Sequence, residues 1–247
     1  MFSISQIQNC SQLKTLLKPV VDFAINISVS GQENIPISKP FVLVSNHRSA
    51  IDPLIISSVM QRYVAWIADS FLFNVPLLRD VLEAIGTIPA STRSPKNRSA
   101  FHQSGEALHF SQAVGIFPEG HKSIVSGLEH ALGHFNPGFA EIALHYGASI
   151  LPVTIISQKE FVQPISIPKL FCEWFNLPND VAAMRSPVIY RDVHVRIDPL
   201  ISVPSLLPSG ATGQPSQHRF KTAVGRLVEE THARISENLN APRLVRA

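Results

Sequence analysis

Charged side chains are scarce in this sequence. Asp, Glu, Lys and Arg make up 16% of its 247 residues, whereas hydrophobic residues make up 45%. Soluble domains usually carry about 25% charge, so the composition excludes a disordered chain and indicates a globular protein that is unusually apolar. The net charge of +3 comes without a long basic run. This argues against nucleic-acid binding and suits a protein that works beside anionic lipid or anionic small molecules.

Cysteine is also rare. Cys10 and Cys172 lie far apart and form no Cys-x-x-Cys or Cys/His zinc spacing, so we expect no disulfide scaffold and a reducing compartment. Residues 1–14 are polar and lack the apolar core of a secretory signal. The longest uncharged stretch, 199–218, is broken by prolines and glycines, so no transmembrane helix is predicted. If the protein contacts a membrane, we expect it to lie on the surface.

Several catalytic and binding motifs are missing. The chain has no Gly-x-Ser-x-Gly serine-nucleophile motif, no Gly-x-Gly-x-x-Gly and no Walker loop, which leaves an esterase or a nucleotide-binding protein without support. His130 and His134 have the i,i+4 spacing of zinc ligands, with His121 nearby. The segment lacks the Glu of His-Glu-x-x-His, so a solvated helix face is the favoured interpretation.

The hydrophobic pattern predicts strands that alternate with helices. Continuous or alternating apolar runs predict strands, and apolar residues at helical spacing predict helices. The strands are expected at 24–30, 41–44, 113–117, 149–156 and 188–197, and the helices at 11–23, 53–61, 75–84, 100–110, 139–146 and 216–239. This order predicts an α/β fold with a mostly parallel sheet flanked by helices. Because no linker or repeat is visible, we expect one domain over 1–247, with C-terminal strands and a helix in 187–239.

Three segments carry further expectations. Pro19 falls inside the pattern of 11–23, so that helix is kinked or begins there, and its apolar face is expected on the core rather than in a bilayer interface. The Ser- and Arg-rich stretch 86–99 is expected to be a loop. The aromatic stretch that contains Phe161, Phe171, Trp174 and Phe175, with Lys159 and Lys169, fits a membrane-contacting surface and core packing equally well.

The segment that follows the strand 41–44 offers an acid–base pair. Polar residues directly after a buried strand lie at the carboxyl edge of the sheet, where ligands usually bind. His47 is the natural general base, and Asp52 could fix its tautomer and stabilise the imidazolium. The alternative is that Asp52 caps the helix beginning at Pro53, with Asn46 as a turn residue and His47 on the surface.

A second polar segment, 117–122, follows the strand 113–117. The Glu119 carboxylate, beside Gly120, could hold a hydroxyl group or pair with a ligand-binding arginine. The alternative is an ordinary Pro-Glu-Gly turn.

Together these segments resemble the glycerolipid acyltransferases typified by 1-acylglycerol-3-phosphate acyltransferase. The resemblance runs over about 27–156 and rests on four blocks in the family's order. These are Gly31-Gln32-Glu33-Asn34-Ile35-Pro36, Asn46-His47-Arg48-Ser49-Ala50-Ile51-Asp52, Ile116-Phe117-Pro118-Glu119-Gly120, and Phe135-Asn136-Pro137-Gly138-Phe139-Ala140 with its following Gly147-Ala148-Ser149-Ile150-Leu151-Pro152-Val153. The resemblance implies the catalytic pair His47 and Asp52.

The acceptor site is also implied by this resemblance. It assigns acceptor binding to Arg93, Glu119, Gly120 and Lys122. The family's phosphate-holding arginine follows a glycine by a few apolar residues, whereas Gly86 here precedes Arg93 by seven positions. Lys96 and Arg98 are therefore substitutes for Arg93.

The function that follows is an expectation of the same resemblance. The protein would move a fatty acyl group from acyl-CoA or acyl carrier protein to the hydroxyl of a lysophospholipid, foremost 1-acyl-sn-glycerol 3-phosphate, in phospholipid synthesis. It would need no metal or redox cofactor and would bind peripherally at the cytoplasmic face of a membrane. One alternative is a related enzyme that uses another lysolipid or alcohol. The other is a non-catalytic lipid-binding module, which would not need His47 and Asp52 together.

Overall fold

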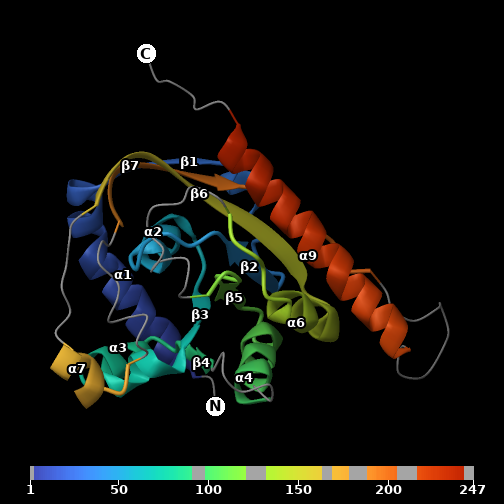
Figure 1. Ribbon diagram of the computed structural model, residues 1–247, viewed down its shortest axis with the longest axis horizontal. Helices are drawn as coiled ribbons and strands as arrows, with labels where there is room; N and C mark the ends of the chain where they lie inside the picture. Colours follow the sequence, from blue (N-terminus) through green and yellow to red (C-terminus); the bar gives the residue numbers. More distant parts are fainter. Residues whose placement is uncertain are drawn as a thin grey trace.

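A computed structural model of the chain describes residues 3–90, 98–120, 132–162, 169–177, 188–204 and 216–241. Within these ranges seven strands form one sheet in the order β1-β7-β6-β2-β5-β3-β4 (Figure 1). The strands are β1 (Asn26–Ser30), β2 (Phe41–Ser45), β3 (Val64–Asp69), β4 (Ile88–Ala90), β5 (Ala113–Ile116), β6 (Ser149–Val162) and β7 (Val188–Ile197).

The sheet is mostly parallel, as the alternation of strands and helices predicts. β2 lies at its centre and pairs in parallel with β5 on one side and β6 on the other. The pairs β1–β7, β3–β5 and β3–β4 are also parallel, and β6–β7 is the only antiparallel pair among the described strands. An isolated antiparallel bridge joins Ile150 and Ile201. Because β2 and β5 run side by side in the same direction, the two polar segments that follow them leave the sheet at the same edge.

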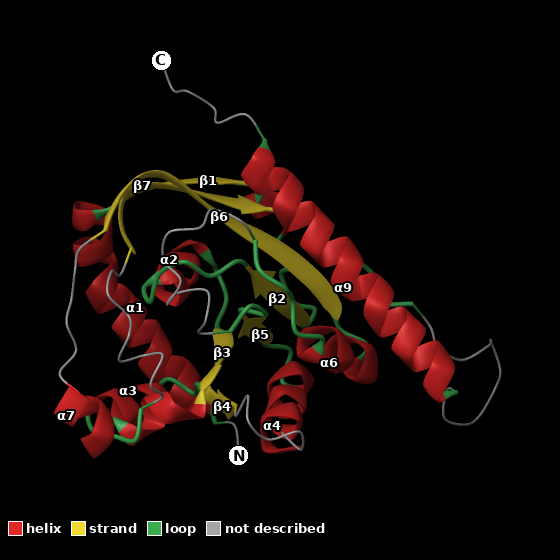
Figure 2. Ribbon diagram, viewed as in Figure 1, coloured by secondary structure: helices red, strands yellow, loops and turns green. Residues whose placement is uncertain are grey.

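Helices cover both faces of the sheet (Figures 1 and 2). Side chains alternate along β2: Val42 and Val44 belong to one core cluster, and Phe41 and Leu43 to the other. The first cluster is completed by helices α4, α6 and α9, and the second by α2. The helices are α1 (Ile4–Ala24), α2 (Asp52–Val59), α3 (Leu78–Ala84), α4 (Arg98–His109), α6 (Gly138–Tyr146), α7 (Lys169–Trp174) and α9 (Gln217–Asn240), with short 3-10 helices at η1 (Gln32–Asn34) and η2 (Ser70–Asn74).

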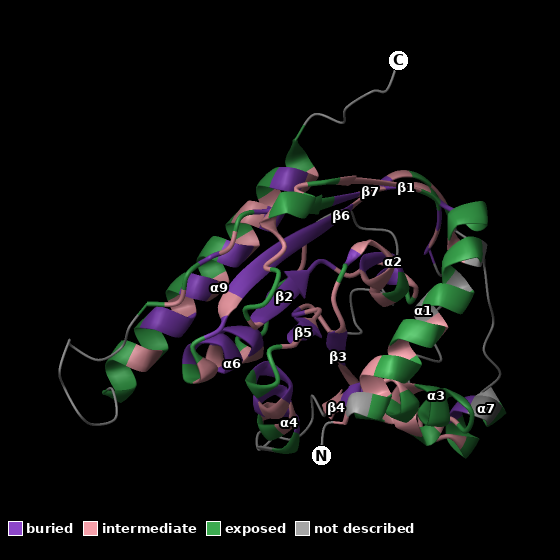
Figure 3. Ribbon diagram, turned by 180° about the vertical axis from the view of Figure 1, so that it is seen from behind, coloured by how far each residue is buried: buried purple, intermediate pink, exposed green. Residues whose placement is uncertain are grey.

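Burial explains why the central strands read as continuous apolar runs. Every residue of β2 is buried, because helices cover both of its faces. The helix predicted over 216–239 is also confirmed: Val224, Leu227 and Ile235 are buried along one face of α9. Figure 3 shows the central strands and this face in the buried colour, whereas α1 is largely exposed.

Three expectations about these elements need correction. α1 starts at Ile4 and continues through Pro19, so the helix does not begin at the proline. Its apolar side is not simply packed on the core, since the Leu16 side chain is 72% exposed. The segment 86–99 is not wholly a loop, because it holds β4 near its start and the first two residues of α4 at its end.

Candidate active site

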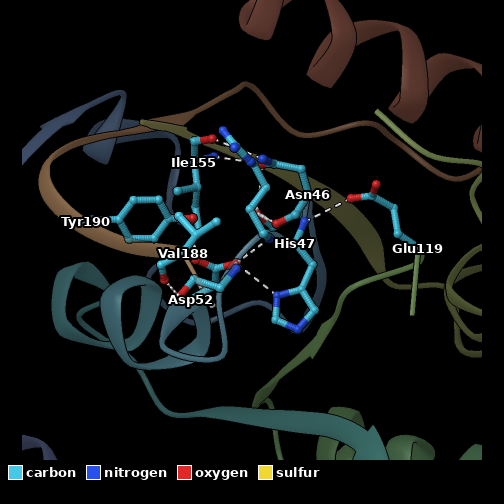
Figure 4. Close-up of polar contacts among 10 residues, drawn as sticks. Asn46, His47, Asp52, Glu119, Ile155, Val188 and Tyr190 are labelled. Carbon is cyan, nitrogen blue, oxygen red and sulfur yellow. Dashed lines mark hydrogen bonds and ion pairs between the residues drawn. The ribbon is translucent and has the colours of Figure 1, made fainter. Parts of the chain in front are cut away.

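The predicted base and acid meet in the loop between β2 and α2 (Figure 4). The His47 Nδ1 atom lies 2.9 Å from Asp52 Oδ2, and the two side chains are 11% and 0% exposed. A carboxylate only accepts hydrogen bonds, so Nδ1 carries the proton and donates to Oδ2. The free nitrogen of the neutral ring is then Nε2, to which none of the described residues hydrogen bonds. Such a histidine is ready to take a proton from another molecule.

The carboxylate of Asp52 folds back onto the loop rather than capping the helix. Its Oδ2 also accepts hydrogen bonds from the backbone N–H groups of Arg48 at 2.8 Å and Ser49 at 2.9 Å. Both donors precede Asp52 in the chain, whereas an N-cap carboxylate accepts from N–H groups that follow it. The capping interpretation is therefore wrong. Asp52 occupies the first helical position, followed by Pro53, whose lost N–H has no helical partner there.

Asn46 is also more than a turn residue. Its side chain is buried, donates to the Ile155 carbonyl at 3.0 Å and accepts from the Ile155 N–H at 2.8 Å. The amide thus continues the β2–β6 ladder for one step after the last strand pair, Ser45 with Val153. This docking fixes the direction in which the chain enters the His47 loop.

Two aromatic rings support the imidazole. The His47 ring stacks on Phe117, with centroids 4.0 Å apart and an interplanar angle of 17°. Phe117 in turn stacks on Trp66 of β3, with centroids 4.9 Å apart. The indole N–H of Trp66 donates to Ser57 Oγ of α2 at 2.9 Å, which anchors the stack at its far end. The stack and Asp52 together restrict the rotation of the base.

Glu119 bonds to the backbone on either side of the site. Its Oε1 accepts from the His47 N–H at 2.9 Å, and its Oε2 accepts from the Gly133 N–H at 2.8 Å. Gly120, the next residue, has a φ of +73°, a left-handed conformation that favours glycine. The segment is thus a turn, as the alternative interpretation had it, whose carboxylate ties the 117–120 loop to the histidine loop. A role of Glu119 and Gly120 in acceptor binding stays a prediction.

One member of the site comes from far along the chain. The Tyr190 hydroxyl of β7 donates to Asp52 Oδ1 at 3.0 Å. Burial raises the pKa of Tyr190, and the nearby negative charge of Asp52 raises it further, so the phenol stays protonated. The sequence indicates only that Tyr190 lies on a strand, and nothing in its spacing connects it to Asp52. Trp66 was missed as well, because the strand β3 was not predicted.

Several predicted residues lie outside the described ranges. These are Arg93, Lys96 and Lys122, together with His121 and His130 of the zinc alternative. Arg98 begins α4, but its side chain is not among those described. Within the described residues no three potential metal ligands cluster. Cys10 is partly buried and Cys172 is buried. Among the described helices we find none of the length and apolarity that a membrane crossing requires.

A mostly parallel sheet with a His–Asp pair at its carboxyl edge fits a known family of proteins. The chain is a member of the Acyltransferase family, whose family model matches residues 26–156, just over half of the sequence. The matched region contains β2, the His47 loop and the Glu119 turn. It ends before β7, so Tyr190 lies beyond it.

Two similar proteins from different organisms share the same enzyme name. The 1-acyl-sn-glycerol-3-phosphate acyltransferase of Borreliella burgdorferi is 32% identical over 138 residues, which cover 56% of this chain and 54% of the relative. The chloroplastic 1-acyl-sn-glycerol-3-phosphate acyltransferase LPAT1 of Arabidopsis thaliana is 28% identical over 132 residues, covering 53% and 36%. The chain thus spans about half or less of the length of these relatives.

A solved structure shares the fold. The 1-acyl-sn-glycerophosphate acyltransferase PlsC of Thermotoga maritima superimposes with a TM-score of 0.54 at 22% sequence identity. The match covers 91% of this chain and 80% of that one, so it extends over the C-terminal elements that the family model leaves out. The predicted fold class is confirmed.

Proposed function

We propose that this protein transfers a fatty acyl group from acyl-CoA or acyl carrier protein to the free hydroxyl of 1-acyl-sn-glycerol 3-phosphate, a step of phospholipid synthesis. The observation that carries the proposal is the 2.9 Å bond between His47 Nδ1 and Asp52 Oδ2, which leaves Nε2 as the only basic nitrogen of the ring. Membership of the Acyltransferase family and the names of the relatives support the choice of reaction and acceptor.

The proposed mechanism needs no covalent enzyme intermediate, because a thioester is already activated. His47 Nε2 takes the proton of the acceptor hydroxyl as that oxygen attacks the thioester carbonyl carbon. Asp52, fully buried and held by four donors, stabilises the imidazolium that forms. When the tetrahedral intermediate collapses, the C–S bond breaks and the imidazolium returns its proton to the departing thiolate. The ester product and the free thiol leave, and His47 is neutral again.

The acceptor phosphate needs a cation, and we assign this role to Arg93, with Lys122 as a second positive charge. A guanidinium can hold a phosphate through two parallel hydrogen bonds. Arg93→Ala should therefore raise the acceptor KM about 10–100-fold and leave the donor KM unchanged, if one charged hydrogen bond contributes about 1.5–3 kcal/mol. Arg93→Lys should recover part of the loss. Equal acceptor kinetics for Arg93→Ala and wild type would move the phosphate site to Lys96 or Arg98.

We further propose that the protein binds peripherally at the cytoplasmic face of a membrane, where both apolar substrates reside. Large apolar side chains are exposed on or next to three helices: Leu16 (72%) on α1, Leu77 (79%) just before α3, and Trp174 (81%) on α7. In Figure 1 these three helices lie on the side of the molecule away from α9. Exposed aromatic and aliphatic side chains of this kind suit the headgroup region of a bilayer.

The direct test is a product assay with purified protein. Acyl-CoA or acyl carrier protein is supplied with 1-acyl-sn-glycerol 3-phosphate or with one of a panel of other lysolipids and alcohols, and products are identified by mass spectrometry. We expect diacylglycerol 3-phosphate as the dominant product. A product from another acceptor alone would overturn the acceptor assignment. Thioester loss without lipid product would indicate a thioesterase, and binding without turnover would indicate a lipid-binding module.

A further inference from the structure

The two oxygens of the Asp52 carboxylate are held very differently. Oδ2 accepts three hydrogen bonds, from His47 Nδ1 and from the backbone N–H groups of Arg48 and Ser49. Oδ1 accepts one from the described residues, the Tyr190 hydroxyl at 3.0 Å. Because Asp52 is fully buried, water cannot replace that donor. The orientation of the carboxylate therefore depends on Tyr190 on one side and on its own loop on the other.

Tyr190 is built as a rigid donor. Its side chain is 1% exposed and packs in the same apolar cluster as Phe41 and Leu43 of β2. Its backbone pairs with Glu160 in the β6–β7 ladder. Near the start of the same strand, the Val188 carbonyl accepts a hydrogen bond from Ser49 Oγ at 2.6 Å, so β7 contacts the histidine loop twice. The phenol cannot swing away from Asp52 without disturbing the core.

We propose that Tyr190 is a positioning residue for acyl transfer, which holds the Asp52 carboxylate so that Oδ2 faces His47 Nδ1. The inference rests on the proposed general-base role of His47, since Tyr190 acts through Asp52 and contacts neither substrate in the mechanism above. It adds a residue of β7, 138 positions from Asp52 in the sequence, to a catalytic pair that comes from one short loop in the first half of the chain.

Removing the hydroxyl should change the rate and the pH profile but not substrate affinity. Without the Tyr190 hydroxyl, Oδ1 loses the one donor that it has among the described residues, so the carboxylate can rotate and the anion is less well stabilised. The His47–Asp52 pair then binds a proton more readily, so the acid limb of the pH–rate profile moves to higher pH. Two other carboxylates lie near the pair. Glu160 Oε1 accepts from Arg48 Nη2 at 2.8 Å, whereas Glu160 Oε2 is buried and has no hydrogen-bond partner among the described residues. Both oxygens of Glu119 accept backbone N–H groups.

The test compares Tyr190→Phe with Tyr63→Phe in the full chain. Tyr63 is a matched control, because its hydroxyl also donates inside the fold, to the Ile85 carbonyl at 2.6 Å, but away from the site. For Tyr190→Phe we expect kcat to fall about 10-fold or more, and both KM values to stay within about twofold. The acid limb of the pH–rate profile should move to higher pH. For Tyr63→Phe we expect a lower Tm with wild-type kcat and pH profile.

A double-mutant cycle tests whether Tyr190 acts through Asp52. In an Asp52→Asn background, Tyr190→Phe should lower kcat by no more than about twofold, since the anion it orients is gone. Wild-type kcat and pH profile for Tyr190→Phe would overturn the proposal, as would a change confined to KM or a full loss in the Asp52→Asn background. His47→Ala is assayed in parallel. A large loss of kcat in that variant would show that the general-base role of His47 holds even if the proposal for Tyr190 fails.

A second probe covers the case in which Tyr190→Phe does not fold. The chain has three tyrosines, so in a Tyr63→Phe, Tyr146→Phe background 3-fluorotyrosine labels position 190 alone. Fluorine makes the phenol a stronger donor with little added volume. The acid limb should then move to lower pH, the opposite direction from Tyr190→Phe. An unchanged profile in a folded, active, labelled protein would overturn the proposal.

Discussion

At the scale of single residues, Asp52→Asn separates the charge of this side chain from its shape. The backbone N–H groups of Arg48 and Ser49 require an acceptor, so the amide oxygen should take the Oδ2 position and the amide nitrogen should face Tyr190. The His47 tautomer is then kept, but the imidazolium loses its counter-charge. We expect kcat to fall about 10²–10⁴-fold with a folded protein. A kcat within tenfold of wild type would show that the charge is not needed.

Single residues also show how far the sequence could predict the site. The five-residue separation of His47 and Asp52 was enough to predict the pair, because one short loop brings both to the sheet edge. Spacing could not decide between a catalytic carboxylate and a helix cap, since both place an acidic residue before Pro53. Tyr190 could not be predicted at all, because its contact with Asp52 depends on the antiparallel return of β7 against β6.

At the scale of elements, Asn46 tests how the loop is docked to the sheet. Asn46→Ala would leave the buried Ile155 N–H and carbonyl without these two side-chain bonds. We expect the free energy of unfolding to fall by about 2–6 kcal/mol, since each of the two unpaired buried groups costs about 1–3 kcal/mol. Urea unfolding measures this.

The control for that measurement is Asn9→Ala. Asn9 also donates its amide to a carbonyl, that of Ala84, but the bond is exposed. We expect its loss to change stability by less than about 0.5 kcal/mol. Equal stability losses for the two variants would contradict the docking role of Asn46.

The strands that are buried on both faces were the ones that the sequence predicted most closely. β2, β5 and the start of β6 are continuous apolar runs because helices cover both faces, so they were predicted closely. β3 was missed, since Val64–Asp69 has no Gly or Pro at its ends and its six residues suit a helix as well. β4 is only three residues long, too short to leave a periodic signal.

At the scale of the whole molecule, membrane binding tests the exposed apolar side chains. Trp174→Ala should weaken binding to anionic phospholipid vesicles about tenfold, the effect of losing about 1.4 kcal/mol of interfacial contact. Ile37→Ser is a matched control: Ile37 is 95% exposed but lies in the loop that enters β2, at the opposite edge of the sheet from His47. Vesicle co-sedimentation at low salt gives both values.

Two results would contradict the proposed surface. If Trp174→Ala bound as tightly as wild type while Ile37→Ser did not, the membrane would contact the surface around Ile37 rather than the surface around Trp174. If wild type did not bind vesicles at all, peripheral association would be wrong. From sequence, the aromatic stretch around Trp174 fitted membrane contact and core packing equally, because composition alone does not reveal which residues a sheet leaves uncovered.

The α/β fold class could be predicted from the alternation of strands and helices along the sequence. The order of the strands within the sheet could not. Each parallel crossover can place the next strand on either side of the strand before it. The hydrophobic pattern of the sequence is the same in both arrangements, so it cannot tell them apart. The sheet edge on which His47 and Glu119 meet was predicted nonetheless, because the carboxyl ends of neighbouring parallel strands share one edge whatever their order.

The most direct measurement is the initial rate of acyl transfer by His47→Ala, with the donor and acceptor that wild type uses best. In the proposed mechanism His47 Nε2 takes the acceptor proton, so its removal should lower kcat about 10²–10⁴-fold or more. The protein should stay folded but with a lower Tm, because the His47 side chain is only 11% exposed and donates to the buried Asp52 carboxylate. A folded His47→Ala protein that transfers acyl groups at a rate near that of wild type would contradict the account.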